Sequence, residues 1–450
     1  MANLIFHFCF IFFMVCSGLC QSHFTNSDRG ALLAFKSSVR DRYNNLQNWS
    51  NSSSICNWSG VTCDSENENE RVRILSLAQM GLKGTLPSQI GNLSFLVKLD
   101  LSSNNLYGKL PKELFQLQRL ETLNLSYNAF GGEIPSSMGN LFTLQHLILG
   151  NNSFGGIIPK SISNLSRLET LDLNSNSLQG SIPFDIGRLQ HLKILRLSVN
   201  KLSGIMPPSI SNISSLERLI LSLNLLQGYI PIEMNKLTKL KIIYLGGNKL
   251  TGQIPRSIGN FIMLQELSLS NNNLQGGIPN EISNLTNVKN IYLDNNQLSG
   301  HIPKSIGKLT TLQELSLANN FFEGIIPNEI RSLTNLKIMD LSANQLFGYI
   351  PRGIENLTML QNLNLENNNL EGSIPLEIGN LQQPETLLLS QNKLSEYIPS
   401  EIFNISTLKV LSLYDNSLAG SLPSDFGYGL SNLQELYLWG NKLSGRIPNI

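Results

Sequence analysis

The sequence has almost no excess charge of either sign. Its 33 Lys and Arg residues nearly balance its 32 Asp and Glu residues, which leaves a net charge of +1, and no block of basic residues runs along it. Nucleic-acid-binding proteins present clustered Lys and Arg, so we expect no nucleic-acid partner. The five histidines show no HExxH or other metal-ligand spacing. We therefore predict a chain that is not an enzyme, with no catalytic residues, no metal site and no cofactor.

Long apolar runs are also missing, except at the start. From Leu4 to Cys16 the sequence reads LIFHFCFIFFMVC, followed by the small residues Ser17 and Gly18. Such a run spans roughly 20 Å as a helix, whereas a bilayer core is about 30 Å thick. We interpret residues 1–20 as a signal peptide, although no Lys or Arg precedes the apolar run. This predicts the secretory pathway.

Cysteine is scarce beyond this leader. Only Cys56 and Cys63, in the segment CNWSGVTC, lie outside the first twenty residues. No second pair accompanies them, so a disulfide in a secreted chain is favoured over a metal site.

Proline, in contrast, is placed with great regularity. Fifteen prolines follow one another at 24-residue intervals from Pro87 to Pro423, and Pro448 comes one residue late. A constant period over most of a chain indicates one small structural unit stacked many times, in which each unit contacts its neighbours. Such a protein offers long faces in place of a deep central pocket.

One unit, from Leu96 to Arg119, reads LVKLDLSSNNLYGKLPKELFQLQR. Leucines alternate with polar residues at its start, which predicts a short strand with one buried face. Asn104 and its equivalents down the chain are expected to bond the turning backbone of adjacent units. Gly108 permits backbone angles that are costly for other residues, and Pro111 suits the first position of a second short strand.

The two ends of the array differ. In residues 27–41 the pattern SDRGALLAFKSSVRD predicts a short amphipathic helix, capped by Ser27 or Asp28, which helps to cover the first repeat. We therefore assign residues 21–70 to an N-terminal cap and residues 71–450 to the repeats. The last repeat is incomplete at Ile450, and we expect a closing C-terminal cap to be missing.

These residues resemble the extracellular region of plant leucine-rich-repeat receptors. The phrase LxGxIPxxIGNL recurs, for example as LTGQIPRSIGNF at 250–261, and the blocks at 31–41 and 56–63 look like that family's cap. The longer repeat at 422–448 is similar to one in the immune-receptor kinases. The resemblance implies an α/β leucine-rich-repeat solenoid: a right-handed superhelix of about 16 repeats of 24 residues, with short parallel strands on the concave face and a helical N-terminal cap.

The resemblance also implies a function. We expect the ligand-sensing ectodomain of a receptor-like kinase or receptor-like protein, which binds a peptide or protein on its concave face and recruits a co-receptor kinase, with a role in defence. Full length, it would lie outside the plasma membrane, held by a C-terminal anchor that is missing here and followed by a Ser/Thr kinase; as written it would be secreted. The alternative is a secreted inhibitor of a microbial cell-wall-degrading enzyme.

The exposed strand positions predict two ligand-binding patches. The first combines apolar and basic residues of types favoured at interfaces, and the second is aromatic. The ten candidate residues are Ile194, Arg196, Arg218, Ile220, Ile242, Tyr244 and Tyr292 in the first patch, and Tyr414, Tyr437 and Trp439 in the second.

Glycosylation sequons add to the picture of a secreted chain. Two of them, Asn124 and Asn151, fall on or beside a predicted strand, where sugars would screen the concave face. The other six in the repeats lie five residues after a proline and share one outer column: Asn92, Asn164, Asn212, Asn284, Asn356 and Asn404. One repeat departs from the pattern, with Pro384 at a leucine position and Glu396 at a glycine position, so we expect local irregularity there.

Overall fold

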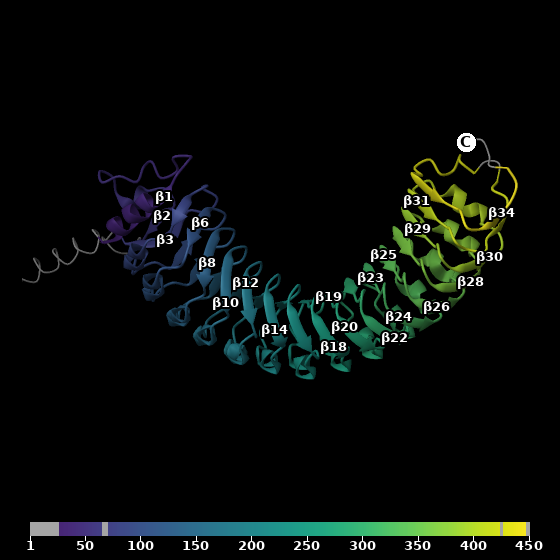
Figure 1. The fold of residues 1–450 in the computed structure, drawn as a ribbon, viewed down its shortest axis with the longest axis horizontal. Coiled ribbons are helices and arrows are strands. Elements are labelled where there is room, and N and C mark those ends of the chain that lie inside the picture. Colours follow the sequence, from purple (N-terminus) through teal and green to yellow (C-terminus); the bar gives the residue numbers. More distant parts are fainter. Residues whose placement is uncertain (1–26, 65–70, 424–425, 447–450) are drawn as a thin grey trace, which may run out of the picture. The chain divides into compact units, whose positions relative to one another are not determined.

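The computed structural model describes residues 27–64, 71–423 and 426–446. The chain forms two compact units, Met1–Ser203 and Gly204–Ile450. Within each unit, successive turns of the chain stack side by side, and each turn adds one strand next to that of the turn before it (Figure 1). The expected signal peptide and the residues around Pro448 lie outside the described residues.

Each unit contains a parallel sheet built from the short strands that the leucine pattern predicts. In β5 the central Leu99 is fully buried, whereas Lys98 and Asp100 on either side remain partly exposed. The strands pair at a shift of one repeat, so that Leu99 lies opposite Leu123. We call the surface formed by the two residues that flank the central residue of each strand the strand face.

The strands of this sheet have the following bounds. In the first unit they are β3 (Val72–Ser76), β5 (Lys98–Asp100), β7 (Thr122–Asn124), β9 (His146–Ile148), β11 (Thr170–Asp172) and β13 (Ile194–Arg196). In the second unit they are β15 (Arg218–Ile220), β17 (Ile242–Tyr244), β19 (Glu266–Ser268), β21 (Asn290–Tyr292), β23 (Glu314–Ser316), β25 (Ile338–Asp340), β27 (Asn362–Asn364), β29 (Thr386–Leu388), β31 (Val410–Ser412) and β33 (Glu435–Tyr437).

A column of asparagines holds the turn that follows each strand. Asn104 donates from Nδ2 to the carbonyl oxygens of Leu77 and Leu101, at 2.7 and 3.0 Å, and its Oδ1 accepts from the backbone N–H of Leu82 at 2.9 Å. The same bonds link adjacent repeats at other members of the column, such as Asn296. The predicted role of the asparagines is confirmed: they satisfy backbone groups that the turn would otherwise leave buried and unpaired.

A second set of parallel strands follows the asparagine turn. In β6 the chain leaves the strand through Gly108, whose φ of +90° is in the left-handed region that favours glycine. The strands are β4 (Lys83–Thr85), β6 (Asn105–Gly108), β8 (Ala129–Glu133), β10 (Ser153–Ile157), β12 (Ser177–Gly180) and β14 (Lys201–Ile205), then β16 (Leu225–Gly228), β18 (Lys249–Gln253), β20 (Asn273–Gly276), β22 (Gln297–His301), β24 (Phe321–Gly324), β26 (Gln345–Gly348), β28 (Asn369–Ser373) and β30 (Lys393–Ser395).

The recurring proline lies at a different place from the one expected. Pro111 does not begin a second strand, because β6 ends at Gly108; it caps the 3-10 helix η3 with φ −68°. Its fixed φ suits the residue that leads into a helix. Because each repeat contains one such helix, the prolines recur with the period of the repeat. The helices are η2 (Ser88–Asn92), η3 (Lys112–Gln116), η4 (Ser136–Asn140), η5 (Lys160–Asn164) and η6 (Phe184–Arg188), then η7 (Pro208–Asn212), η8 (Ile232–Lys236), η9 (Arg256–Asn260), η10 (Asn280–Asn284), η11 (Lys304–Lys308), η12 (Asn328–Ser332), η13 (Arg352–Asn356), η14 (Leu376–Asn380) and η15 (Ser400–Asn404).

The N-terminal segment covers the first repeat. Residues 27–38 are helical, and the fully buried carboxylate of Asp28 accepts hydrogen bonds from Arg71 and from the backbone N–H of Val72. Cys56 and Cys63 form a disulfide beside the stacked rings of Trp49 and Trp58. The segment also contains η1 (Ile55–Asn57) and two antiparallel strands, β1 (Val39–Arg40) paired with β4 and β2 (Val61–Cys63) paired with β3.

The irregular repeat near residue 390 behaves as its sequence predicts. Glu396 adopts φ +65°, in the left-handed region, and β30 ends just before it. Pro384 is accommodated: β29 still forms two residues later, and the Pro384 carbonyl accepts a hydrogen bond from Thr407. Two short strands, β32 (Ala419–Gly420) and β34 (Lys442–Leu443), follow as a separate pair.

Candidate functional site

The first predicted patch divides between the two units. Ile194 and Arg196 lie on β13 in the first unit. In the second unit, β15 and β17 bring Arg218 opposite Ile242, and the third residues of the same strands also pair. The strand pairing thus places the second-unit members on one surface.

Two members of this patch are less available than the sequence indicated. Ile220 is only 9% exposed, so it belongs to the core and offers little apolar surface. Arg196 is ion-paired with Asp172 at 3.0 Å. Burial raises the pKa of Asp172, although the Asn174 backbone N–H and Arg196 favour its charged form. Arg196 therefore pairs with a buried carboxylate of its own chain, whereas Arg218 stays exposed.

The tyrosines of the patch are held by carboxylates that the sequence reasoning missed. The Tyr244 hydroxyl donates to Glu266 on the next strand, and the Tyr292 hydroxyl donates to Glu314 in the same way. Burial, together with the hydrogen bond to Glu266, raises the pKa of Tyr244 to about 12. The pKa of Tyr292 is raised for the same reasons. Both phenols therefore remain protonated donors throughout the physiological range.

These carboxylates make the strands that follow Tyr244 acidic, beyond most of the predicted apolar and basic patch. From β17 to β25 the strand face and the residue two positions after each strand carry four acids, Glu266, Asp294, Glu314 and Asp340. None of the four forms an ion pair with Lys or Arg in the described part of the chain. A spacing of 22 residues between Tyr and Glu is the signal that could have found the pairs, because it places the two side chains diagonally on neighbouring strands.

The second predicted patch is brought together as expected. Tyr414 and Trp439 stack with ring centroids 4.5 Å apart and planes 15° apart. Trp439 is 60% exposed, so one face of the stack is open to solvent. Tyr437 lies on β33 and donates to Glu435 on the same strand at 2.9 Å. The patch presents aromatic surface of the kind that is enriched at interfaces.

The sequon asparagines fall into the two classes that their spacing predicts. The six of the outer column, from Asn92 to Asn404, each end a 3-10 helix and are exposed. Asn124 ends β7 on the strand face and is half-buried, and its Oδ1 accepts from Ser126. Asn151 is half-buried in the turn after β9, at φ +55°.

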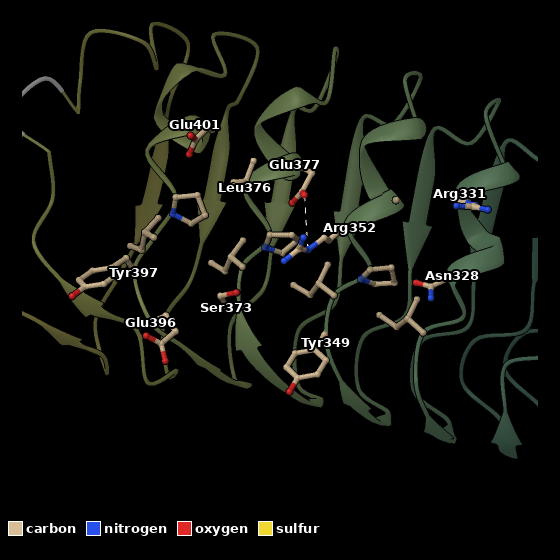
Figure 2. A pocket seen from close by; sticks show the side chains of 18 of the residues that line it. Asn328, Arg331, Tyr349, Arg352, Ser373, Leu376, Glu377, Glu396, Tyr397 and Glu401 are labelled. Atoms are coloured by element: carbon tan, nitrogen blue, oxygen red, sulfur yellow. Dashed lines mark ion pairs between the residues drawn. The ribbon is translucent and has the colours of Figure 1, made fainter.

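A shallow groove of about 1490 Å³ lies in the second unit, and the sequence analysis did not find it. Figure 2 shows Tyr349 and Tyr397 standing along it, with Arg352 beside Glu377. These charged groups are 3.9 Å apart. The lining comes from the residues around each proline and from the 3-10 helices, and none of it belongs to the first sheet. The groove is thus a separate surface from the strand face.

Comparison with known proteins adds to this geometry. The family model of the leucine-rich-repeat N-terminal domain matches residues 25–64, and that of the leucine-rich-repeat region matches residues 134–245 and 220–349. A third model, Leucine Rich Repeat, matches five further stretches, at 95–117, 119–141, 359–381, 407–428 and 432–450. The chain belongs to the leucine-rich-repeat family.

A curated relative of this leucine-rich-repeat chain is the probable LRR receptor-like serine/threonine-protein kinase At3g47570 of Arabidopsis thaliana. It is 48% identical over 89 residues, which is 19% of this chain and 9% of the relative. A second Arabidopsis relative, the receptor-like kinase EFR, is 39% identical over 122 residues, 26% of this chain and 12% of the relative. The chain thus matches only a small part of these relatives' length.

Solved structures of plant receptors share the fold. The crystal structure of PEPR1–AtPEP1 aligns with a TM-score of 0.88 at 35% identity, over 94% of this chain and 60% of that one. The plant peptide hormone receptor RGFR1 in complex with RGF2 aligns with a TM-score of 0.73 at 33% identity, over 86% and 72%. The Arabidopsis receptor kinase HAESA, in complex with the peptide hormone IDA and the co-receptor SERK1, aligns with a TM-score of 0.64 at 29% identity, over 94% and 87%.

The described residues contain neither a membrane-spanning helix nor a metal-binding cluster. No helix there has the length and apolar character needed to cross a bilayer. No group of three or more His, Cys, Asp or Glu residues in the same part of the chain is arranged to hold a metal ion.

Proposed function

We propose that this chain is the extracellular ligand-sensing part of a plant receptor-like kinase or receptor-like protein. It captures a peptide or protein ligand on the strand face and then recruits a co-receptor kinase. It binds its ligand and catalyses no reaction itself. It reaches the outside of the cell by the secretory pathway, and in the full-length protein it lies at the plasma membrane.

The strand face between β15 and β25 carries this proposal. It combines half-buried tyrosines, an exposed Arg218 and three carboxylates without cationic partners, on a backbone whose turns are held by the asparagine column. A rigid surface with aromatic and charged side chains binds at a low entropic cost, because little has to be ordered on binding. The neighbours RGFR1 and HAESA, solved with peptide hormones, support a peptide as the ligand.

The co-receptor and the defence role are two further parts of this proposal. HAESA was solved with the co-receptor SERK1, which supports recruitment of a second receptor. The relative EFR is a receptor-like kinase that is 39% identical to this chain over 122 residues. We propose a defence role from the resemblance to immune-receptor kinases alone.

The test uses the secreted chain and a displayed library of random peptides. Enriched peptides should bind the Tyr244→Ala variant at least about tenfold more weakly, since truncating one interface tyrosine commonly costs that much. The matched control is Tyr349→Ala in the groove, which should leave affinity unchanged. Equal loss in both variants, or loss only in Tyr349→Ala, would move the ligand away from the strand face.

A further inference from the structure

The strand face contains a two-repeat period. The segment LQELSL occurs at 264–269 and again at 312–317. Each copy follows a strand with the segment IYL, at 243–245 before the first copy and at 291–293 before the second. Tyr244 with Glu266 and Tyr292 with Glu314 are therefore the same pair displaced by 48 residues. The structure keeps this identity, because each tyrosine donates to the glutamate of the following strand.

The strand-face positions around the two pairs carry no positive charge. The first and third residues of β17, β19, β21, β23 and β25 include no Lys or Arg, whereas they include Glu266, Glu314 and Asp340. Three lysines directly precede strands of this set: Lys241 is ion-paired with Glu217 at 2.7 Å, whereas Lys289 and Lys337 form no ion pair in the described part of the chain. All four members of the two pairs are half-buried, so each keeps part of its surface open to a ligand.

The distance between the pairs restricts the shape of that ligand. Neighbouring strands lie ~4.8 Å apart, so the pairs repeat every ~9.6 Å along the face. A polyproline II helix has about three residues per turn and rises ~3.1 Å per residue, which places every third side chain on one side at ~9.3 Å. A β-strand presents every second residue, at roughly 6.6 Å, and its third residue points away.

We infer that β17–β25 bind a polyproline II peptide segment that carries a basic side chain at every third residue. This inference rests on the proposed function and specifies the ligand of that surface. Each carboxylate accepts a charge-assisted hydrogen bond from one basic side chain, while the tyrosine ring packs against its aliphatic stem and against the proline rings between. The phenol–carboxylate bond orients both groups before the ligand arrives.

Synthetic peptides with defined registers test this inference. The first probe has Lys at every third position in a proline host, the second has the same composition with its Lys residues in one block, and the third is an α-helical peptide with Lys seven residues apart, a spacing of ~10.5 Å. Titration calorimetry with the intact secreted chain should show the first probe bound at least about tenfold more tightly than either of the others. Equal binding of the first two, or preference for the helical probe, would overturn the inference.

Variants of the two Tyr–Glu pairs test whether this surface distinguishes the lysine registers of the probes. Glu266→Gln and Glu314→Gln should each weaken the first probe and together abolish the preference for its register. Tyr292→Phe removes one hydroxyl with almost no change in shape and provides a second, milder variant. Glu377→Gln and Tyr349→Phe in the groove are matched controls that should change nothing; a preference that survives the double Gln variant would contradict the proposal.

The outcomes separate this inference from the proposed function. Library peptides that lose affinity in Tyr244→Ala, but lack the three-residue spacing and do not depend on Glu266 or Glu314, would refute the inference and leave the peptide-sensing role intact. If no library peptide depends on Tyr244 and the first probe does not bind, both are wrong.

Discussion

At the scale of single residues, each turn after a strand contains one residue in the left-handed region. Asparagine occupies this position in several repeats, for example Asn271 at φ +55° and Asn319 at φ +52°, and asparagine tolerates such angles. Val199 holds φ +54° at the equivalent position of its own repeat, although a β-branched side chain is poorly suited to it. The neighbouring repeats therefore hold Val199 in a backbone conformation that valine alone disfavours.

The Val199→Asn variant should therefore be more stable than the parent chain. Val199 is 45% exposed, so little apolar burial is lost, and relief of the backbone strain should contribute about 1 kcal/mol. Chemical denaturation of the secreted chain measures this, and the reverse change, Asn271→Val, is the control that should destabilise. No change in either variant would show that the backbone angle carries no strain.

Replacing a column asparagine should have the opposite effect. Asn296 is buried and bonds three carbonyls, of Leu269, Leu293 and Asp294, and the backbone N–H of Leu274. Asn296→Ala removes the acceptor of the Leu274 N–H, at a cost of roughly 1–3 kcal/mol if water cannot reach that group. The carbonyls of Leu269 and Leu293 each lose one bond but keep those from Asn272 and Asn320. Hydrogen exchange should speed up in the repeats around residue 296 first. Exchange that is unchanged there would contradict the role given to the column.

At the scale of the elements, the two phenol–carboxylate pairs join β17 to β19 and β21 to β23. An unfolded tyrosine titrates near pH 10.0, whereas burial and Glu266 raise the pKa of Tyr244 to about 12. Because the folded value lies above the unfolded one, the stabilisation from this bond is complete below pH 10 and is lost as the pH rises through about 12.

Ultraviolet titration of the tyrosines should therefore show a late fraction, which is the fraction that ionises at a higher pH than the rest. The Tyr244→Phe and Tyr292→Phe variants should each remove one late-titrating group, and Tyr349→Phe, an exposed tyrosine of the groove, should leave the late fraction intact. A titration in which all tyrosines ionise together would show that the two bonds do not form.

How much of this could be predicted depends on whether a feature is local or shared between repeats. The strands, the asparagine column and the glycine turns follow from residues that recur at one period, and so they were predictable from the sequence. The proline was misplaced because it suits both a strand start and a helix start. The burial of Ile220 and the Tyr–Glu bonds were missed because both depend on which side chains meet across neighbouring strands.

At the scale of the whole molecule, the sugars and the ligand have to share the available faces. The outer column, with Asn92 and Asn404 among its six exposed members, leaves the strand face clear. Sugars on Asn124 and Asn151 would instead screen the strand face around β7 and β9, so ligand contacts should begin beyond them.

Glycopeptide mass spectrometry of the secreted chain checks this arrangement. We expect the six outer sites to be occupied, because each asparagine is exposed at the end of its helix. We also expect sugars on Asn124 and Asn151. If both of these were bare, the argument that the ligand is kept to the repeats beyond β9 would lose its support.

The most direct test of peptide capture on the strand face is a photo-cross-linking map. A library peptide, or the probe with Lys at every third position, is given a photoreactive group and bound to the secreted chain. After irradiation and digestion, mass spectrometry identifies the residues to which it is attached. The structure predicts attachment to strand-face residues between β15 and β25, near Tyr244 and Tyr292. Attachment along the groove at Tyr349 and Tyr397, or along the 3-10 helices, would contradict it.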